Sequence, residues 1–226
     1  MRFVLSNLKL QINDNIYIKD PETSALGKKI LKESILLIHE IGFEAFTFKK
    51  LGERIESNES SIYRYFENKH KLLVYLSSWY WSWIEYRLVF GVANMAVAAD
   101  RLKTAITIVT EETADDEATE HIDESVLKKI IINNFTKTLL TKEVDEENRL
   151  GFFEIYQRVI QRVAGIIKEH APHYAFAESL ASTIIQGALH QHFLKTHFQS
   201  LTNCNDMISP TEFYINLTEN ALKNSL

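Results

Sequence analysis

The stretch from Gly42 to Lys71 constrains the fold of this chain more than any other part of it. Its apolar residues are spaced for two short helices, and a residue with a capping side chain, Thr47 or Asn58, precedes each of them. Glu56 and Ser57 are expected to form a tight turn between the two. Helices joined in this way form a helix-turn-helix, whose second helix can lie in the major groove of DNA. The stretch therefore predicts a DNA-binding chain.

The second of these helices, which follows Asn58, has an apolar side and a polar side. Ile62 and Phe66 are four positions apart, so they share one side of a helix and are expected to point into the core. Tyr63, Arg64 and Tyr65 lie between these two anchors. Part of that set must therefore face solvent or a partner.

Helical periodicity continues through most of the chain, and no segment after residue 24 has the periodicity of a strand. Ser24 is expected to cap a first long helix that ends at Gly42, a residue suited to left-handed backbone. Another long helix is expected to begin near Asn68. Three prolines and seven glycines in 226 residues leave room for long helices, so we predict an all-α fold. Further helices are expected at about 94–113, 123–141, 148–170, 175–199 and 211–225.

The first twenty residues differ from the rest because their apolar residues alternate. Leu8, Leu10 and Ile12 alternate, an Asn-Asp-Asn turn follows, and Ile16 and Ile18 alternate again. This pattern predicts a short β-hairpin or an extended arm, and a flexible tail is the alternative.

Composition narrows the class of protein. The single cysteine, Cys204, excludes an internal disulfide and fits a reducing compartment. No secretory signal is visible, and the most apolar window, 79–99, is interrupted by Glu85 and Arg87. We therefore expect a soluble, cytoplasmic protein without a membrane span. The formal net charge of the chain is −5. Residues 25–72, however, carry nine Lys or Arg against seven acidic residues, so this segment has the net positive charge that favours DNA binding.

The sequence resembles the tetracycline-repressor-like (TetR) family of bacterial transcription regulators. The resemblance rests on Ile38 to Gly42, on Phe43 to Leu51, and above all on Ser61 to Phe66, followed by Asn68-Lys69 and Leu72-Leu73. That last run is similar to the end of the family's recognition helix and the Lys and Leu-Leu that follow it. The resemblance covers about residues 24 to 75, roughly a quarter of the chain.

The resemblance implies an all-α homodimer with an N-terminal three-helix DNA-binding domain and a larger helical domain that binds an effector and dimerises. We accordingly expect an arm or hairpin at 1–22, a helix-turn-helix domain at 23–70 and an effector-binding and dimerisation domain at 71–226. The dimer interface is assigned to the last two helices, 175–199 and 211–225. The expected partners are a pseudo-palindromic DNA operator, a second copy of the chain and an unknown small molecule.

The expected DNA contacts lie on the two short helices and just beyond them. Thr47 and the start of its helix can offer a hydroxyl and N–H groups to a phosphate. Tyr63, Tyr65 and Lys69 resemble the family's phosphate-clamping positions, which fix position without specifying sequence. The residues expected at the interface are Thr47, Lys49, Lys50, Asn58, Glu59, Ser60, Ser61, Tyr63, Arg64, Tyr65 and Lys69.

Three residues depart from the family pattern. Glu56 stands where the family has Gly, and a left-handed backbone there costs strain. Ser57 replaces an apolar residue of the turn. Glu59 replaces a frequent Lys, where an acid stabilises the first turn of a helix or accepts a hydrogen bond from cytosine N4. We expect an unusual operator preference at these positions.

The expected effector is apolar or aromatic, because the candidate pocket residues are apolar or aromatic. The aromatic run around Trp79, Trp81 and Trp83 is expected mainly to pack the core and a neighbouring helix. The candidate pocket residues are Trp83, Tyr86, Phe135, Phe152, Tyr156 and Phe193.

Catalysis, metal binding and a cofactor are not expected. His190 and His197 share a helix face but lie about two turns apart, too far for one ion. The chain has no phosphate loop, dinucleotide motif or nucleophile elbow. A helical adaptor that has lost affinity for DNA is the main alternative, given Glu56 and Glu59. A helical carboxylate enzyme is the second, although the only Glu-x-x-His spacing ends at His70.

Overall fold

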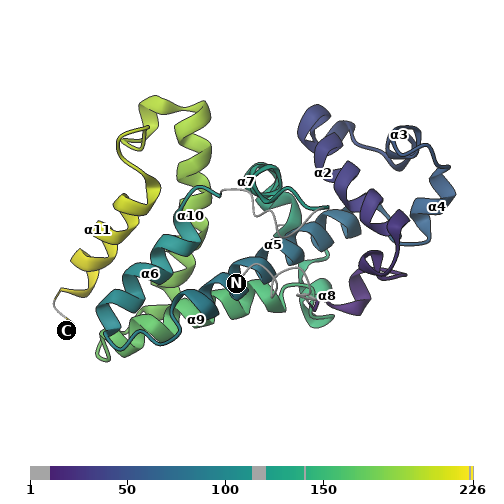
Figure 1. Cartoon of the computed structure of the whole chain (residues 1–226). Helices are drawn as coiled ribbons and strands as arrows, with labels where there is room; N and C mark the ends of the chain where they lie inside the picture. Colours follow the sequence, from purple (N-terminus) through teal and green to yellow (C-terminus); the bar gives the residue numbers. More distant parts are fainter. Residues whose placement is uncertain (1–10, 114–120, 140, 224, 226) are drawn as a thin grey trace. The chain divides into compact units, whose positions relative to one another are not determined.

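The computed structural model describes residues 11–113, 121–139, 141–223 and 225, and every regular element in these residues is helical (Figure 1). The predicted all-α fold class is confirmed for this part of the chain. The residues divide into two compact units: unit 1 contains 1–82 and 113–154, and unit 2 contains 83–112 and 155–226. Unit 1 includes 113–154, and the helix at 124–139 packs on the first long helix of the chain. The predicted functional domains, 1–22, 23–70 and 71–226, stay a prediction.

The described part of the N-terminal segment is a packed arm. It contains two 3-10 turns, η1 (Asp14–Ile16) and η2 (Pro21–Thr23). Ile12 and Ile16 are buried, and Asn13 Nδ2 donates a hydrogen bond to the carbonyl of Leu150 at 2.7 Å. The predicted hairpin is wrong for these residues, because the Asn-Asp-Asn turn starts a 3-10 turn whose apolar residues pack on the helices. Leu8 and Leu10 lie outside the described residues.

Three helices follow the arm: α2 (Ala25–Ala45), α3 (Phe48–Arg54) and α4 (Glu59–Tyr63). Ser24 caps α2, because its Oγ accepts a hydrogen bond from the backbone N–H of Gly27 at 3.1 Å. Gly42 has a φ of 78° and interrupts the helical backbone within α2. The cap and the left-handed glycine are both confirmed.

The core of unit 1 is completed by the first part of α5 (Lys69–Gly91), by α7 (Glu124–Leu139) and by α8 (Val144–Arg149). Every residue of α5 from Leu72 to Ile84 is buried. A helix that is apolar all round belongs in a core. The aromatic run at 79–83 therefore packs inside the molecule.

Unit 2 contains α6 (Ala98–Thr110), most of α9 (Glu154–His170), α10 (Ala177–His197), η3 (Gln199–Leu201) and α11 (Pro210–Leu222). Helix α6 packs against both α10 and α11.

Helices α10 and α11 approach each other closely at Gly187. A Cβ at this position would lie 2.0 Å from the hydroxyl of Tyr214, so only glycine fits. His192 of α10 is buried, and its ring hydrogen-bonds the carbonyl of Thr110, the last residue of α6, at 2.7 Å. The Thr110 hydroxyl forms a hydrogen bond of 2.9 Å with the hydroxyl of Thr211 in α11. These contacts tie the three helices together.

One predicted helix begins later than expected. The sequence predicted a helix over 148–170, whereas α8 ends at Arg149 and α9 begins at Glu154. Gly151 has a φ of 80°, which breaks the helical path between them. This positive φ favours glycine, and the Asn13 side chain of the arm lies close by, because a Cβ on Gly151 would be 2.7 Å from Asn13 Nδ2. None of the described helices is long and apolar enough to cross a lipid bilayer.

Candidate nucleic-acid interface

Helix α3 begins where the sequence predicted and presents lysines at its start. The hydroxyl of Thr47 accepts a hydrogen bond from the backbone N–H of Lys50 at 3.2 Å, as an N-cap does. Thr47, Lys49 and Lys50 are all exposed. Lys50 Nζ also donates to the carbonyl of Ala45 at 2.9 Å. The first turn of α3 therefore carries positive charge at a surface.

In the turn between α3 and α4, Glu56 stands at the position where the family has Gly, and its backbone is left-handed. Glu56 has a φ of 56°, in the left-handed region where a side chain costs strain. The N–H of Ser57 bonds the carbonyl of Gly52 at 2.9 Å. A Cβ on Gly52 would lie 2.8 Å from the Ser57 carbonyl oxygen, so the glycine makes this close approach possible.

Helix α4 is short and depends on its cap. Asn58 Oδ1 accepts hydrogen bonds from the Ser60 hydroxyl, from the Ser61 hydroxyl at 3.2 Å and from the Ser61 backbone N–H at 3.1 Å. Ile62 and Phe66 are fully buried, as predicted. Both serine hydroxyl protons thus point to Asn58, so the first turn presents oxygen acceptors outward.

The outward side of α4 carries an aromatic and a basic side chain. Tyr63 is 48% exposed, and its ring meets Phe48 edge-on at 5.0 Å. Partial desolvation, followed by the charge and a hydrogen bond of Glu59, raises the pKa of the Tyr63 hydroxyl. Arg64 is exposed and Glu59 is half-buried. The hydrogen bond orients Tyr63 and the carboxylate of Glu59 relative to each other.

Tyr65 lies inside the domain, unlike Tyr63. Its side chain is 3% exposed, and its hydroxyl shares a hydrogen bond of 2.8 Å with Ser24 Oγ. Its carbonyl accepts a bond from the N–H of Ile18 at 2.8 Å. This geometry favours a structural role for Tyr65, and its predicted phosphate contact stays a prediction.

Lys69 also has a structural role. Its Nζ donates to the carbonyls of Phe43, Glu44 and Phe46 at 3.0, 3.1 and 3.2 Å. These carbonyls lie at the end of α2, which a cation stabilises through the helix dipole. A contact of Lys69 with DNA remains a prediction.

An ion-pair network that the sequence analysis missed holds α3 on α2. Arg54 Nε lies 2.6 Å from Glu33, and its terminal nitrogens lie 2.5 and 2.8 Å from Glu40. The hydrogen bond from Arg54 lowers the pKa of the Glu40 carboxyl group. Arg54 is 14 positions from Glu40 and 21 from Glu33, and no helical spacing connects such distant positions. The network can therefore be seen only in the structure, where α2 and α3 pack together.

Comparison with protein families identifies this region. Residues 30–76 match the family described as bacterial regulatory proteins, tetR family. Residues 30–76 are therefore similar to the TetR family, and we call this segment the TetR-family domain. The matched segment covers α3, α4 and parts of α2 and α5, so the resemblance drawn from the sequence is confirmed.

Solved structures share the fold over most of the chain. A tetR-family regulatory protein from Rhodococcus RHA1 is 15% identical, with a TM-score of 0.59 over 89% of this chain and 97% of its own. AibR in complex with isovaleryl coenzyme A and operator DNA is 14% identical, with a TM-score of 0.56 over 86% and 98%. The superantigen PfiT is 19% identical, with a TM-score of 0.56 over 92% and 98%. No curated protein matches the sequence significantly.

Outside the TetR-family domain, the six candidate pocket residues do not line one described cavity. Phe135 and Phe152 belong to unit 1, and the other four belong to unit 2. Within unit 2, Tyr156 bonds Gln186, whereas Phe193 contacts the rings of His197 and Phe198 near the end of α10. Trp83 lies under Arg87, and Tyr86 packs on Phe90. A pocket formed by all six stays a prediction.

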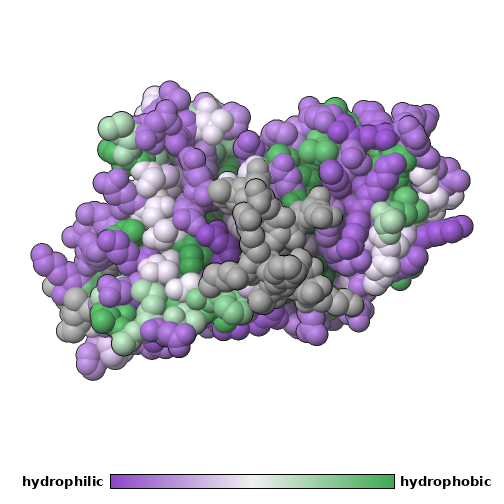
Figure 2. Space-filling view, viewed as in Figure 1, coloured by the Kyte–Doolittle hydropathy of each residue, from purple (hydrophilic) through white to green (hydrophobic). Residues whose placement is uncertain are grey.

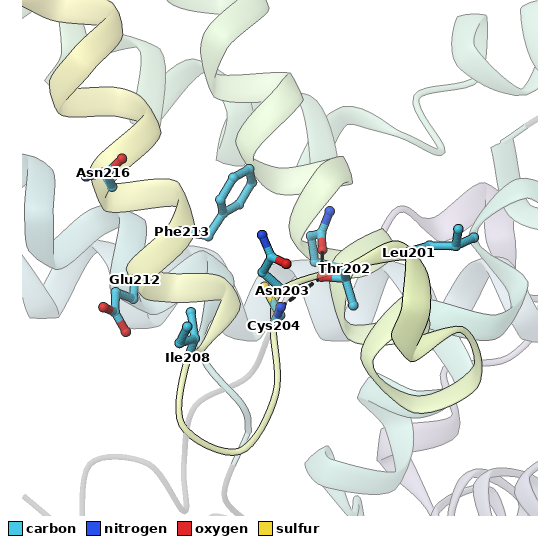
Figure 3. A pocket seen from close by; sticks show the side chains of 9 residues that line it. Leu201, Thr202, Asn203, Cys204, Ile208, Glu212, Phe213 and Asn216 are labelled. Carbon is cyan, nitrogen blue, oxygen red and sulfur yellow. Dashed lines mark hydrogen bonds between the residues drawn. The ribbon is translucent and has the colours of Figure 1, made fainter.

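A different cavity, of about 470 Å³, lies between the end of α10, the loop after it and the start of α11 (Figure 3). Ile208 and Phe213 line one side, and Thr202 and Asn203 line the other. Cys204 is buried, and its N–H donates to the Thr202 hydroxyl at 3.0 Å. Among the described residues, no group of three or more metal-ligating side chains comes together.

Exposed apolar side chains gather at this end of unit 2. Figure 2 shows apolar and hydrophilic residues side by side at the loop that joins α10 and α11, and mostly hydrophilic residues over α2 and α3. We call this set the α10–α11 surface; its members are Phe198, Leu201, Met207, Ile208, Phe213 and Leu217, which are 37% to 89% exposed.

Proposed function

We propose that this chain is a DNA-binding transcriptional repressor that responds to a small molecule and acts in the cytoplasm without catalysis. The observation that supports this most directly is the capped, outward-facing α4 of a TetR-family domain. Its Tyr63 and Arg64 are exposed, as are Lys49 and Lys50 at the start of α3, and the Tyr63 ring packs on Phe48 of that helix. A helix-turn-helix places these positions at a major groove, with base contacts from the start of the second helix.

The chain is proposed to bind DNA as a homodimer. The α10–α11 surface supports this, because large exposed apolar patches on a protein mark an interface with another protein. It lies on α11 and on the segment that joins α10 to α11, and α10 and α11 are the two helices to which the dimer interface was assigned from the sequence. A symmetric dimer would bind a pseudo-palindromic operator whose half-sites lie about 34–36 Å apart, or a small multiple of that.

A small-molecule effector is proposed from the resemblance and from one structural relative. AibR, which shares the fold, was solved with isovaleryl coenzyme A and operator DNA together. The predicted effector of this chain is apolar or aromatic. Its binding would change the affinity for DNA by favouring one of two conformations.

The alternative is a helical adaptor without DNA affinity. Glu56 and Glu59 support it, because acidic side chains near α4 repel phosphate. The fold also occurs in the superantigen PfiT, so the fold alone does not specify DNA binding.

Operator selection and salt titration distinguish the two proposals. Double-stranded DNA bound by the full-length protein would be selected from a random library, and the affinity for the selected site measured by fluorescence anisotropy from 50 to 200 mM salt. A repressor should select a two-fold-symmetric site and lose roughly 10³-fold or more in affinity across that range. The double variant Lys49→Ala/Lys50→Ala should weaken binding to every sequence. Salt-independent or undetectable binding at every sequence would favour the adaptor.

A further inference from the structure

The arm reaches the end of α4 although the family match begins only at residue 30. Its backbone is joined to that end by the hydrogen bond from Ile18 N–H to the Tyr65 carbonyl, 2.8 Å long. Farther back, the arm is anchored by Asn13 on Leu150. The residue that follows Ile18 is therefore held beside the end of α4 by the contact that immediately precedes it.

That residue is Lys19, which is exposed. Its Nζ lies 5.2 Å from the centroid of the Tyr65 ring. The face of an aromatic ring is negative and attracts an ammonium group at this distance. The ring is itself fixed, because its hydroxyl bonds Ser24. Lys19 is therefore positioned by a buried residue of the helix-turn-helix.

The dimensions of the groove place this cation near phosphate. Five residues of α-helix, the length of α4, extend about 7.5 Å, and the major groove is about 12 Å wide. The ends of a helix in that groove lie near its walls, which are the phosphate backbones. A lysine beside the last turn of α4 is then within reach of one wall.

The acidic neighbours of Lys19 in the arm have other partners. Asp20 Oδ1 accepts a hydrogen bond from the N–H of Glu22 at 2.9 Å and caps η2. Asp14 accepts a hydrogen bond from the Tyr17 hydroxyl. These carboxylates stabilise the turns of the arm.

We propose that Lys19 is a phosphate-contacting residue, and that the N-terminal arm is through it part of the DNA-binding surface. Tyr65 has the complementary role: its ring positions the ammonium group, and its hydroxyl fastens the end of α4 to the start of α2. The proposal rests on the proposed function, since it extends the same interface to a residue outside the family match. It assigns to Lys19 the phosphate contact that the sequence assigned to Tyr65.

The slope of log affinity against log salt tests the assignment. Each phosphate contact adds about 0.9 to this slope for double-stranded DNA. Because each protomer of the proposed dimer contributes one Lys19, Lys19→Ala should lower affinity roughly 30- to 100-fold at 0.1 M salt and reduce the slope by about 2, with no change in base preference. The loss of affinity between 50 and 200 mM salt should become about 12-fold smaller.

Three variants control the measurement. Lys103→Ala removes an equally exposed charge from α6 in unit 2 and should leave the slope unchanged. Lys19→Arg keeps the charge and should restore the slope. Tyr65→Phe keeps the ring beneath Lys19 and removes only the hydroxyl, so its slope should equal that of the wild-type protein. Circular dichroism would confirm that each variant is folded.

Two results would overturn the proposal while leaving the proposed function intact. One is a slope and affinity of Lys19→Ala equal to those of Lys103→Ala while the wild-type protein binds its operator. The other is a slope reduced by about 2 in Tyr65→Phe and unchanged in Lys19→Ala, which would return the contact to the tyrosine hydroxyl. A wild-type protein that binds no DNA would overturn both.

Discussion

The surface of α3 and α4 and the α10–α11 surface are both exposed, but they are built for different partners. The first presents lysines, serine oxygens, Tyr63 and Arg64 on a short helix that is held by an N-cap. The second presents large apolar side chains such as Met207 and Phe213 on and beside two longer helices. A polar, basic surface suits a polyanion, and an apolar one suits a second protein. The comparison indicates that one chain carries separate surfaces for DNA and for its own copy.

The largest expected effect is a loss of operator affinity when the α10–α11 surface is disrupted. Phe213→Glu places a charge in the α10–α11 surface and should convert the proposed dimer to a monomer. Because two linked half-site contacts can exceed one by 10²–10⁴-fold, operator affinity should fall about 100-fold or more. Light scattering after size-exclusion chromatography would report the mass, and anisotropy the affinity.

The matched control for that variant is Phe90→Glu. Phe90 is also exposed, at 54%, but it lies near the end of α5 and outside the α10–α11 surface. This variant should remain dimeric and bind the operator. If Phe213→Glu stays dimeric with full affinity, the dimer uses another surface.

The next effect concerns base preference on the polar side. Glu59 is a hydrogen-bond acceptor in a first turn that also presents serine oxygens, and cytosine N4 and adenine N6 are the donors of the major groove. Glu59→Gln should shift the preferred base at one half-site position from cytosine to adenine, by about 1–3 kcal/mol. Selection from a random library, with Ser60→Ala alongside, would measure this shift. Identical sites for the wild type and Glu59→Gln would leave Glu59 with its helix-stabilising role only.

A smaller effect is expected on stability, from the backbone strain at Glu56 in the turn between α3 and α4. Glu56→Gly removes a side chain from left-handed backbone at φ 56°, and should raise the free energy of unfolding by about 0.5–1 kcal/mol. Asn94→Gly is the control, since Asn94 has a φ of 62° and asparagine tolerates this region better. Urea denaturation would compare the two. An equal gain in both variants would mean that Glu56 carries no special strain.

The smallest effect concerns an ion-pair cluster in unit 2 that joins α5 to α9. Burial raises the pKa of Glu85, but hydrogen bonds from Arg158 and Arg162 outweigh it, and the net pKa is lowered. A carboxyl group with a lowered folded-state pKa contributes stability that is complete above its unfolded pKa of about 4.3 and is lost as the pH falls through the folded value. Glu85→Gln should therefore show a smaller loss of thermal stability between pH 6 and pH 3 than the wild type. The exposed Glu219→Gln should behave as the wild type, and equal slopes in all three proteins would contradict the assignment.

Much of the helix-turn-helix could be predicted from the sequence because its determinants are local. A cap such as Asn58 acts on an N–H three residues later, and the i, i+4 spacing of Ile62 and Phe66 places both on one side of a helix. The left-handed backbone at Gly42 was predicted for the same reason. Interactions within one turn of helix are fully specified by neighbouring residues.

The sequence left the N-terminal segment open between a hairpin and an arm and placed the start of α9 too early, because both depend on distant contacts. The alternation of Ile12, Ile16 and Ile18 fits a strand as well as an arm. The segment forms an arm because Ile12 and Ile16 are buried against the helices. Gly151 fits helix or turn in the sequence, and in the structure it forms a turn beside the Leu150 carbonyl, which accepts a hydrogen bond from Asn13 of the arm. Local propensity gives way to tertiary packing in both cases.

The sequence by itself determined the all-α class, the caps and turn of the TetR-family domain and the buried anchors of its second short helix, because each follows from residues within a few positions of one another. Only the tertiary structure decided that Tyr65 turns inward to Ser24, that Lys69 closes the end of α2, and that Lys19 lies over the Tyr65 ring. These contacts join residues more than twenty positions apart. No periodicity or spacing encodes such pairs, since the position of each partner is set by how whole helices and the arm pack.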